Sequence, residues 1–187
     1  MGESNDIAQL VAQAKRGDQK AFSDLLNYFW KDVYLFQLGK SRDEDEAEDI
    51  TIKSFAKAFD RIETFDEKYQ FKTWLFTISN NLYIDELRKK KTETISIHKN
   101  PIEIHKIVDE DPSPADKLIQ EQNLAQLKSY IHQLKPHYQV VINMRYFQEL
   151  SYKEMAEKIG EPMNNIKVKL LRAKKLLAEI ITNSERG

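Results

Sequence analysis

The chain has 187 residues, which is enough for one domain of ordinary size or for two small ones. It contains no cysteine, so disulfides and thiolate metal sites are excluded. No apolar run approaches the ~20 residues that span a bilayer, and the N-terminus lacks the apolar core of a signal peptide. We therefore expect a cytoplasmic protein with no membrane insertion.

Glycine and proline are scarce, with 5 residues of each, and Lys, Glu, Leu, Ala and Ile are frequent. This composition is typical of a mainly helical protein. The net charge of −1 hides an uneven distribution, because segment 92–117 is acidic whereas segment 118–187 carries 11 basic and 7 acidic groups. The pattern predicts an all-α chain of two small helical domains, 1–91 and 118–187, joined by an acidic linker, 92–117.

Three helices are predicted before residue 70. The first covers Ile7–Lys15, and Asp18 can cap a second that reaches Gly39. The third begins in the run SRDEDEAED, whose carboxylates favour the positive end of a helix dipole. That run lacks the alternating ligands and the glycine of a calcium loop, so a solvated helix start is the better interpretation. The residues of the third helix left outside its apolar face include Asp49, Ile52, Lys53 and Lys57.

The segment Phe71–Lys91 combines an apolar helical face with an unusual polar one. Its apolar residues recur at helical spacing: Phe71, Trp74, Leu75, Ile78, Leu82 and Leu87. The other face carries Asn80 and Asn81 beside Phe76 and Tyr83, and the helix ends in the basic run Arg88–Lys91. Rings that stack on unpaired bases, amides that bond to base edges and cations that hold phosphates suit nucleic acid. A core helix with a solvated polar face is an equally good interpretation of this stretch alone.

Helical periodicity fails between Thr92 and Lys117, where prolines and acidic residues indicate a linker. Several isoleucines make this linker too apolar for a freely flexible tether. It either packs on the two domains or occupies a groove on a partner, and the sequence does not choose between these alternatives.

Two helices are predicted to open the C-terminal domain. The first covers Leu118–Leu134, and Pro136 suits the first turn of the second. The second helix is expected to bury its apolar residues, Val140, Val141, Met144 and Phe147.

The stretch Leu150–Leu177 predicts a helix-turn-helix. Ser151 and Glu154 fit a capping box, and Gly160 suits the positive φ of a tight turn. A second helix begins near Asn164, with an inward stripe expected at Ile166, Leu170, Ala173 and Leu177. The face left for base edges and phosphates comprises Asn164, Asn165, Lys167, Val168, Lys169, Leu171, Arg172 and Lys175. A basic, solvated helix hairpin is the alternative, but the cap, the glycine and the basic face together favour DNA binding.

Four different motifs follow one another along the chain. They are GDQKAF at Gly17–Phe22, the AED-containing run DEAEDITIKSFAKAF, the segment Phe71–Lys91 and the segment Leu150–Leu177. In this order and spacing the chain resembles bacterial sigma factors, and most closely the small extracytoplasmic-function (ECF) group of the sigma-70 family. The chain departs from the usual family residues at Ile52, Lys53, Asn164, Asn165 and Val168.

The resemblance implies a sigma factor that directs promoter-specific initiation of transcription. The AED helix would bind core RNA polymerase through Asp49, Ile52, Lys53 and Lys57. Residues 1–91 would correspond to sigma region 2, which recognises and opens the minus-ten element and holds a flipped base. The minus-ten contacts would come from Asn80, Asn81, Tyr83, Arg88, Lys89 and Lys90. Residues 118–187 would correspond to region 4, which recognises the minus-thirty-five element through Asn164, Asn165, Lys167, Val168, Lys169, Arg172 and Lys175.

The same resemblance implies core polymerase and promoter DNA, both duplex and melted, as partners, and catalysis would belong to the polymerase. Family members are often silenced by an anti-sigma factor, and nothing in this sequence shows one. No cofactor, metal or catalytic residue is expected, because none of the four histidines lies in a metal-ligand or triad-like setting. A DNA-binding regulator that acts without polymerase is the main alternative, followed by a helical scaffold for protein contacts.

Overall fold

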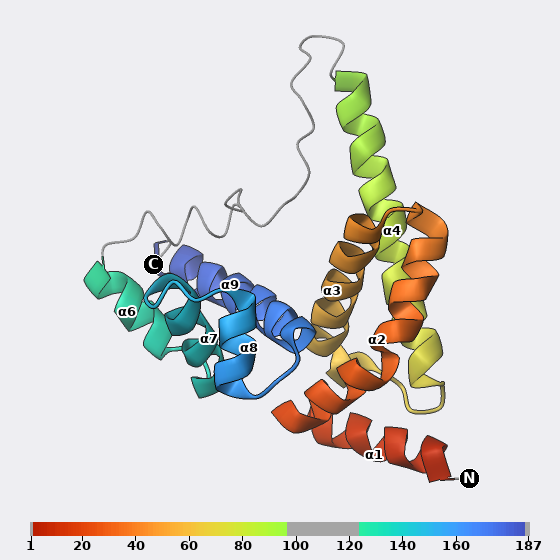
Figure 1. The fold of residues 1–187 in the computed structure, drawn as a ribbon, viewed down its shortest axis with the longest axis horizontal. Helices are drawn as coiled ribbons and strands as arrows, with labels where there is room; N and C mark the ends of the chain where they lie inside the picture. Colours follow the sequence, from red (N-terminus) through yellow and green to blue (C-terminus); the bar gives the residue numbers. More distant parts are fainter. Residues whose placement is uncertain (1, 97–123, 186–187) are drawn as a thin grey trace. The chain divides into compact units, whose positions relative to one another are not determined.

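The computed structural model describes residues 2–96 and 124–185. Every regular element in these two ranges is a helix, and the chain divides into two compact units, Met1–Ile107 and Val108–Gly187 (Figure 1). The predicted all-α fold of two small helical domains is therefore confirmed. Most of the predicted linker lies outside the described residues, so its bounds stay a prediction.

The N-terminal unit begins with two helices joined by a tight turn. Its elements are α1 (Gly2–Lys15), α2 (Gln19–Ser41), α3 (Glu44–Asp60), the 3-10 helix η1 (Ile62–Thr64) and α4 (Phe71–Ser96). Gly17 takes a φ of 85° in the turn, and the Asp18 side chain accepts hydrogen bonds from the next backbone N–H groups, as predicted. Helix α2 continues past Gly39 and ends at Ser41, and the next residue, Arg42, takes a φ of 56°.

Aromatic rings from α2 contact rings on both α3 and α4. The Phe22 ring lies 4.7 Å from that of Phe59 on α3, centre to centre. The Phe29 ring lies 5.5 Å from that of Phe71 on α4. The buried residues of α3 include Ala47, Ile50, Phe55, Ala58 and Phe59. Burial of these large apolar surfaces is the main term that holds the three helices together.

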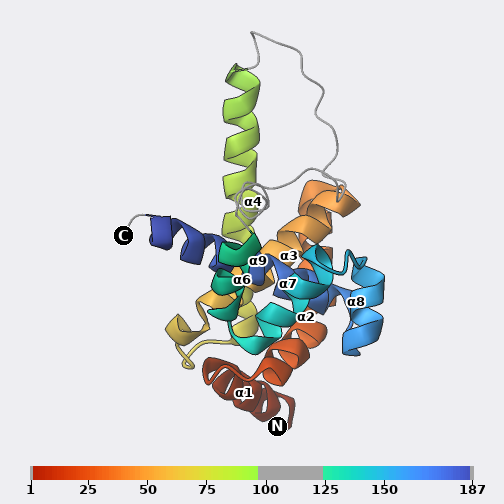
Figure 2. The ribbon, with the colours of Figure 1, turned by 90° about the vertical axis from the view of Figure 1, so that its left-hand side faces the viewer.

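Helix α4 follows its predicted apolar face only over its first half. Phe71 and Leu75 are buried and Leu82 is half-buried, but Leu87 is 44 % exposed, so its predicted burial is wrong. Helix α2 ends at the level of Tyr83, whose hydroxyl donates a hydrogen bond to the Lys40 carbonyl. Beyond this level α2 no longer covers that side of α4, so Leu87 is exposed. Helix α4 continues past the predicted end at Lys91 and projects beyond α2 and α3 (Figures 1 and 2).

A buried polar contact fixes the level at which α2 meets α4. Gln37 and Ser79 are both 0 % exposed, and Gln37 Nε2 donates to Ser79 Oγ at 2.5 Å. Gln37 Oε1 is closed off from solvent and has no hydrogen-bond partner within the described residues. A buried acceptor without a partner costs about 1–3 kcal/mol, so this contact specifies the helix register at some expense in stability.

The C-terminal unit is built on one long helix. Its described elements are α6 (Leu124–His132), α7 (Pro136–Tyr146), α8 (Tyr152–Ile159) and α9 (Met163–Glu185), and the first three pack on α9. Pro136 occupies the first turn of α7, as predicted. The capping box of Ser151 and Glu154 is present at the start of α8, and Gly160 takes a φ of 75° at its end, so both of these predictions are also confirmed.

The inward face of α7 differs from the predicted one. Tyr138, Val141 and Ile142 are buried, whereas Val140 is 44 % exposed and Phe147 is 39 % exposed. The structure turns the face toward positions 138, 141 and 142, which have the i, i+3, i+4 spacing of a buried stripe. Successive residues on a helix are 100° apart, so a face that contains both Val141 and Ile142 leaves Val140 on its outer side.

The Gln37–Ser79 contact makes a prediction about stability. Ser79→Ala should lower the free energy of unfolding by about 1–3 kcal/mol, because it leaves the whole Gln37 amide buried without a partner. The double variant Gln37→Met/Ser79→Ala should recover most of that loss, since both polar groups are then removed. Urea unfolding of the single and double variants measures the difference. A double variant less stable than Ser79→Ala would contradict this account.

Candidate nucleic-acid interface

The structure joins two predicted minus-ten residues on α4 through a lysine of α2. Lys40 donates a hydrogen bond from Nζ to Asn80 Oδ1, and the Tyr83 hydroxyl donates to the Lys40 carbonyl at 3.0 Å. The Lys40 ammonium also lies 4.7 Å from the centre of the Phe36 ring and 5.5 Å from that of Tyr83. Asn80 and Tyr83 are half-buried, whereas Asn81 is exposed.

Lys40 is the member of this group that the sequence did not predict. It lies in the last turn of α2, where a lysine is already favoured by the negative end of the helix dipole. Helical spacing relates residues three or four apart, and Lys40 precedes Asn80 by 40 positions. Only the packing of α2 on α4 brings the two side chains together.

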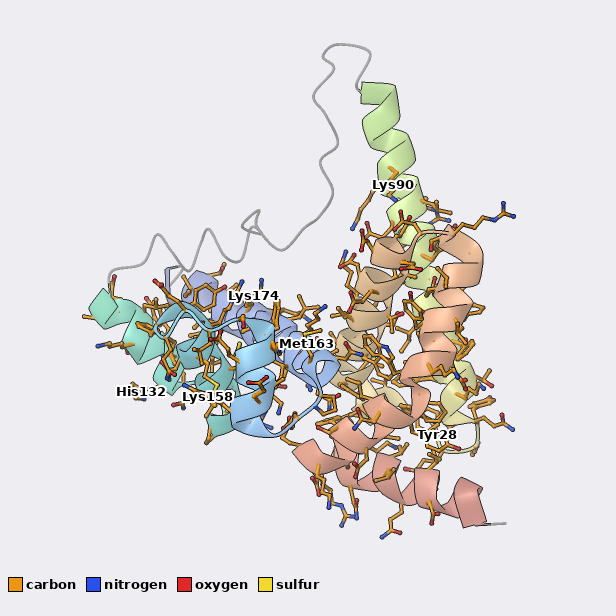
Figure 3. The ribbon with its side chains drawn as sticks, viewed as in Figure 1. Tyr28, Lys90, His132, Lys158, Met163 and Lys174 are labelled. Atoms are coloured by element: carbon orange, nitrogen blue, oxygen red, sulfur yellow. The ribbon has the colours of Figure 1, made fainter. Side chains whose placement is uncertain are left out.

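The basic end of α4 is exposed but already paired with carboxylates. The side chains of Arg88, Lys89 and Lys90 are 78 %, 67 % and 59 % exposed. Lys89 Nζ lies 3.3 Å from Glu86, and Lys90 Nζ lies 3.0 Å from Glu46 on α3. Figure 3 labels Lys90 on α4. Exposed ion pairs of this kind contribute only about 0–1 kcal/mol, so DNA phosphates can replace the carboxylates at little cost.

The predicted polymerase-binding residues share α3, but the structure gives them different surroundings. Lys53 Nζ lies 2.6 Å from Asp49 on its own helix and 3.6 Å from Glu86 on α4. Burial lowers the pKa of Lys53, but the Asp49 hydrogen bond and the two carboxylate charges outweigh it, and the pKa is raised overall. Ile52 and Lys57 are half-buried. Lys53 therefore ties α3 to the helix that carries the predicted minus-ten residues.

The predicted inward stripe of α9 is confirmed. All four of its residues, Ile166, Leu170, Ala173 and Leu177, belong to the buried core of this unit. The turn before α9 begins at Gly160, where the positive φ ends α8. This arrangement leaves the opposite side of α9 outside the core, which is the geometry that a helix-turn-helix needs.

The residues on that opposite side differ in how accessible they are. Lys175 is exposed, and Asn164, Lys167 and Arg172 are half-buried. Lys169 is held by Glu161, with Nζ 2.6 Å from Oε1, and its side chain is only 9 % exposed. To contact a DNA phosphate, Lys169 must therefore exchange the Glu161 carboxylate for that phosphate.

Asn165 and Val168 lie on α9 outside the core cluster of the C-terminal unit. Their contacts with DNA stay a prediction. Both amide atoms of Asn165 lack a hydrogen-bond partner within the described residues. An amide in this state gains free energy from any partner that reaches it.

A histidine lies among the basic residues of this unit. Burial, followed by the charges of Lys169, Arg172 and Lys135, lowers the pKa of His137 from 6.5 to about 4. Its Nε2 is closed off from solvent without a hydrogen-bond partner in the described part of the chain. Burial is the larger cause of this shift, and the three neighbouring cations act in the same direction. Clustered cations of this kind also attract phosphates.

Comparison with protein families divides the chain in the same order as its motifs. Residues 31–93 match the model of Sigma-70 region 2, and residues 124–177 match that of Sigma-70, region 4. The ECF RNA polymerase sigma factor SigW of Bacillus subtilis is 30 % identical over 182 residues, which are 91 % of this chain and 94 % of SigW. The chain belongs to the ECF group of RNA polymerase sigma factors.

Two other sigma factors are also similar to this chain. The ECF sigma factor BldN of Streptomyces coelicolor is 27 % identical over 98 % of this chain and 69 % of BldN. The matched chain in the structure of Rhodobacter sphaeroides SigE with the anti-sigma ChrR is 26 % identical to this chain. The match covers 96 % of this chain and 99 % of the matched chain, with a TM-score of 0.42. The region 2 match of this sigma factor includes Lys40, Asn80 and the basic end of α4, and the region 4 match includes Arg172.

Across residues 2–96 and 124–185, no helix is both long and apolar enough to cross a membrane. Within the same ranges, no three acidic or histidine side chains are grouped so that they could hold a metal ion.

The lowered pKa of His137 predicts an acid-sensitive contribution to stability. An unfolded histidine binds a proton near pH 6.5, whereas the folded one does so only near pH 4. Protons therefore favour the unfolded chain between these two pH values. The stability that neutral His137 contributes to the folded chain is complete above pH 6.5 and is lost as the pH falls toward 4. In urea unfolding, the difference in unfolding free energy between wild type and His137→Gln should become smaller as the pH falls through this interval, because only wild type loses this stability. Parallel pH profiles would show that His137 titrates normally.

Proposed function

We propose that this sigma factor divides promoter recognition between the surfaces described above. Helix α3 binds core RNA polymerase through the residues around Asp49 and Lys53. Helix α4 recognises and opens the minus-ten element, and α9 recognises the minus-thirty-five element in the major groove. The observation that carries this proposal is the polar face of α4, where amides, an aromatic ring and a basic end occur on one helix within the region 2 match.

The two neighbouring asparagines of α4 suit different parts of the minus-ten interaction. Asn81 is exposed, so both its donor and its acceptor are open to an unpaired base. Asn80 has its oxygen bound by Lys40. Arg88, Lys89 and Lys90 lie about two to three turns further along α4, where they can hold the phosphates of the opened strand.

This division of labour assigns no catalytic step to the chain itself. RNA synthesis takes place in the polymerase, and the sigma factor supplies promoter specificity, so we propose that it is not an enzyme. Because its target is the transcription machinery, we also propose that it acts in the cytoplasm. An anti-sigma factor is a further proposed partner, on the strength of the family alone.

Transcription with purified core polymerase tests the proposal. Promoters can be selected from a random template library by the reconstituted holoenzyme, and initiation is then measured with and without the sigma factor. We expect a defined start site only when both components are present, and weak binding to duplex DNA by the sigma factor alone. Tight, sequence-specific duplex binding without polymerase, combined with no start site, would indicate a stand-alone regulator.

The α9 surface generates a second prediction. Arg172→Ala should weaken initiation from a selected promoter by ~1–3 kcal/mol, the value of a bidentate contact to a base. Arg172→Lys should recover little of the loss, because lysine keeps the charge but not the planar fork. Arg172 also lies over the Tyr138 ring, 5.6 Å from its centre, so melting temperatures must be compared. Lys128→Ala, at an exposed position on α6, is the matched control.

An equal loss on promoters with altered minus-thirty-five sequences would show that Arg172 contacts only phosphates. Unchanged initiation with folded Arg172→Ala would remove it from the interface.

A further inference from the structure

The contact between Lys40 and Asn80 determines which atoms Asn80 can offer to a ligand. An ammonium group only donates hydrogen bonds, so the Asn80 atom that faces Lys40 must be the carbonyl oxygen. The amide is therefore fixed in one of its two orientations. Its Nδ2 has no hydrogen-bond partner in the described residues, and it is not among the atoms closed off from solvent. What Asn80 presents outward is an N–H donor.

The lysine that imposes this orientation is itself held in place. Its ammonium lies 4.7 Å from the centre of the Phe36 ring and 5.5 Å from that of the Tyr83 ring, both within cation–π range. The Tyr83 hydroxyl fixes the backbone of the same residue through the Lys40 carbonyl. Three contacts from two helices thus position one charge beside one amide.

A free asparagine recognises adenine through two hydrogen bonds, one accepted by its oxygen and one donated by its nitrogen. In this structure Lys40 occupies the oxygen, so the bond from adenine's amino group is lost and only a bond donated to an adenine ring nitrogen remains. The Lys40 charge also repels that amino group and favours a carbonyl oxygen as the acceptor. Adenine is the one DNA base without a carbonyl group. The geometry therefore points to a donor-only site at Asn80, which we propose accepts a carbonyl-bearing base and disfavours adenine.

Lys40 is then a specificity-determining positioning residue, acting on the base through Asn80. This inference rests on the proposed function, because it requires the polar face of α4 to contact the opened strand. It goes beyond that function by assigning a role to a residue of α2, and by naming the chemical class of base that Asn80 selects.

The test uses the full chain bound to core polymerase and pre-opened fork DNA made from a selected promoter. Each opened position of the non-template strand carries each of the four bases in turn, and relative affinities are measured by competition. With wild type we expect one position at which adenine binds weakest, by roughly 2- to 10-fold, the value of one hydrogen bond. Lys40→Met should abolish the adenine penalty at that position and leave the other positions unchanged.

Two further variants keep the test independent of folding. Lys40→Arg retains a donor for Asn80 Oδ1, so it should retain the adenine penalty. Asn80→Asp keeps an acceptor for Lys40 but has no N–H, so it should lose the preference for carbonyl-bearing bases. Lys31→Met removes a charge from an exposed position of the same helix and is the matched control, expected to behave as wild type.

The outcomes separate the inference from the proposed function. An unchanged adenine penalty in Lys40→Met overturns the inference and leaves minus-ten recognition standing. An equal loss of affinity for all four bases also overturns it, because it shows Lys40 to be a phosphate contact. If wild-type holoenzyme shows no base preference at any opened position, minus-ten recognition itself is contradicted.

Discussion

The packing of α2 against α3 and α4 is the constraint on which the N-terminal unit depends. Aromatic rings along α2 contact rings on both partner helices, so α2 fixes where α3 and α4 lie along each other. The buried Gln37–Ser79 contact then sets the level of α2 on α4. Lys40, about one helical turn after Gln37 on α2, then lies against Asn80 on α4. A shift by one residue would separate both polar pairs, so the properties of the α4 surface follow from the core beneath it.

The electrostatics of this sigma factor suit binding that depends on a partner. Several cations that the proposed function assigns to DNA are engaged with carboxylates of the chain, including Lys90 with Glu46 and Lys169 with Glu161. The net charge is only −1, so no large overall positive field drives the chain onto DNA. Each such phosphate contact must replace an existing ion pair, so it contributes less binding free energy than a contact by an unpaired cation would. We expect binding to core polymerase to supply the additional free energy that the sigma factor alone lacks.

The sequence predicted the local structure well wherever neighbouring residues determine it. The capping box at Ser151, the positive φ of Gly160 and the inward stripe from Ile166 to Leu177 each depend on short-range spacing, and all three are confirmed. Errors occurred where a second helix decides the outcome. Leu87 is exposed because α2 has ended before it, and α7 is rotated relative to the face chosen at Val140. The Lys40–Asn80 and Lys169–Glu161 contacts were not predictable, since they join residues that no helical period relates.

The central claim is that two helical units contact one promoter at two places while bound to the same polymerase. A series of selected promoters that differ only in the number of base pairs between the minus-thirty-five and minus-ten elements tests it most directly. Initiation by the reconstituted holoenzyme should show one sharp optimum, because insertion of half a helical turn, ~5 base pairs, moves one element to the opposite side of the duplex. Equal initiation at all spacings would contradict the account.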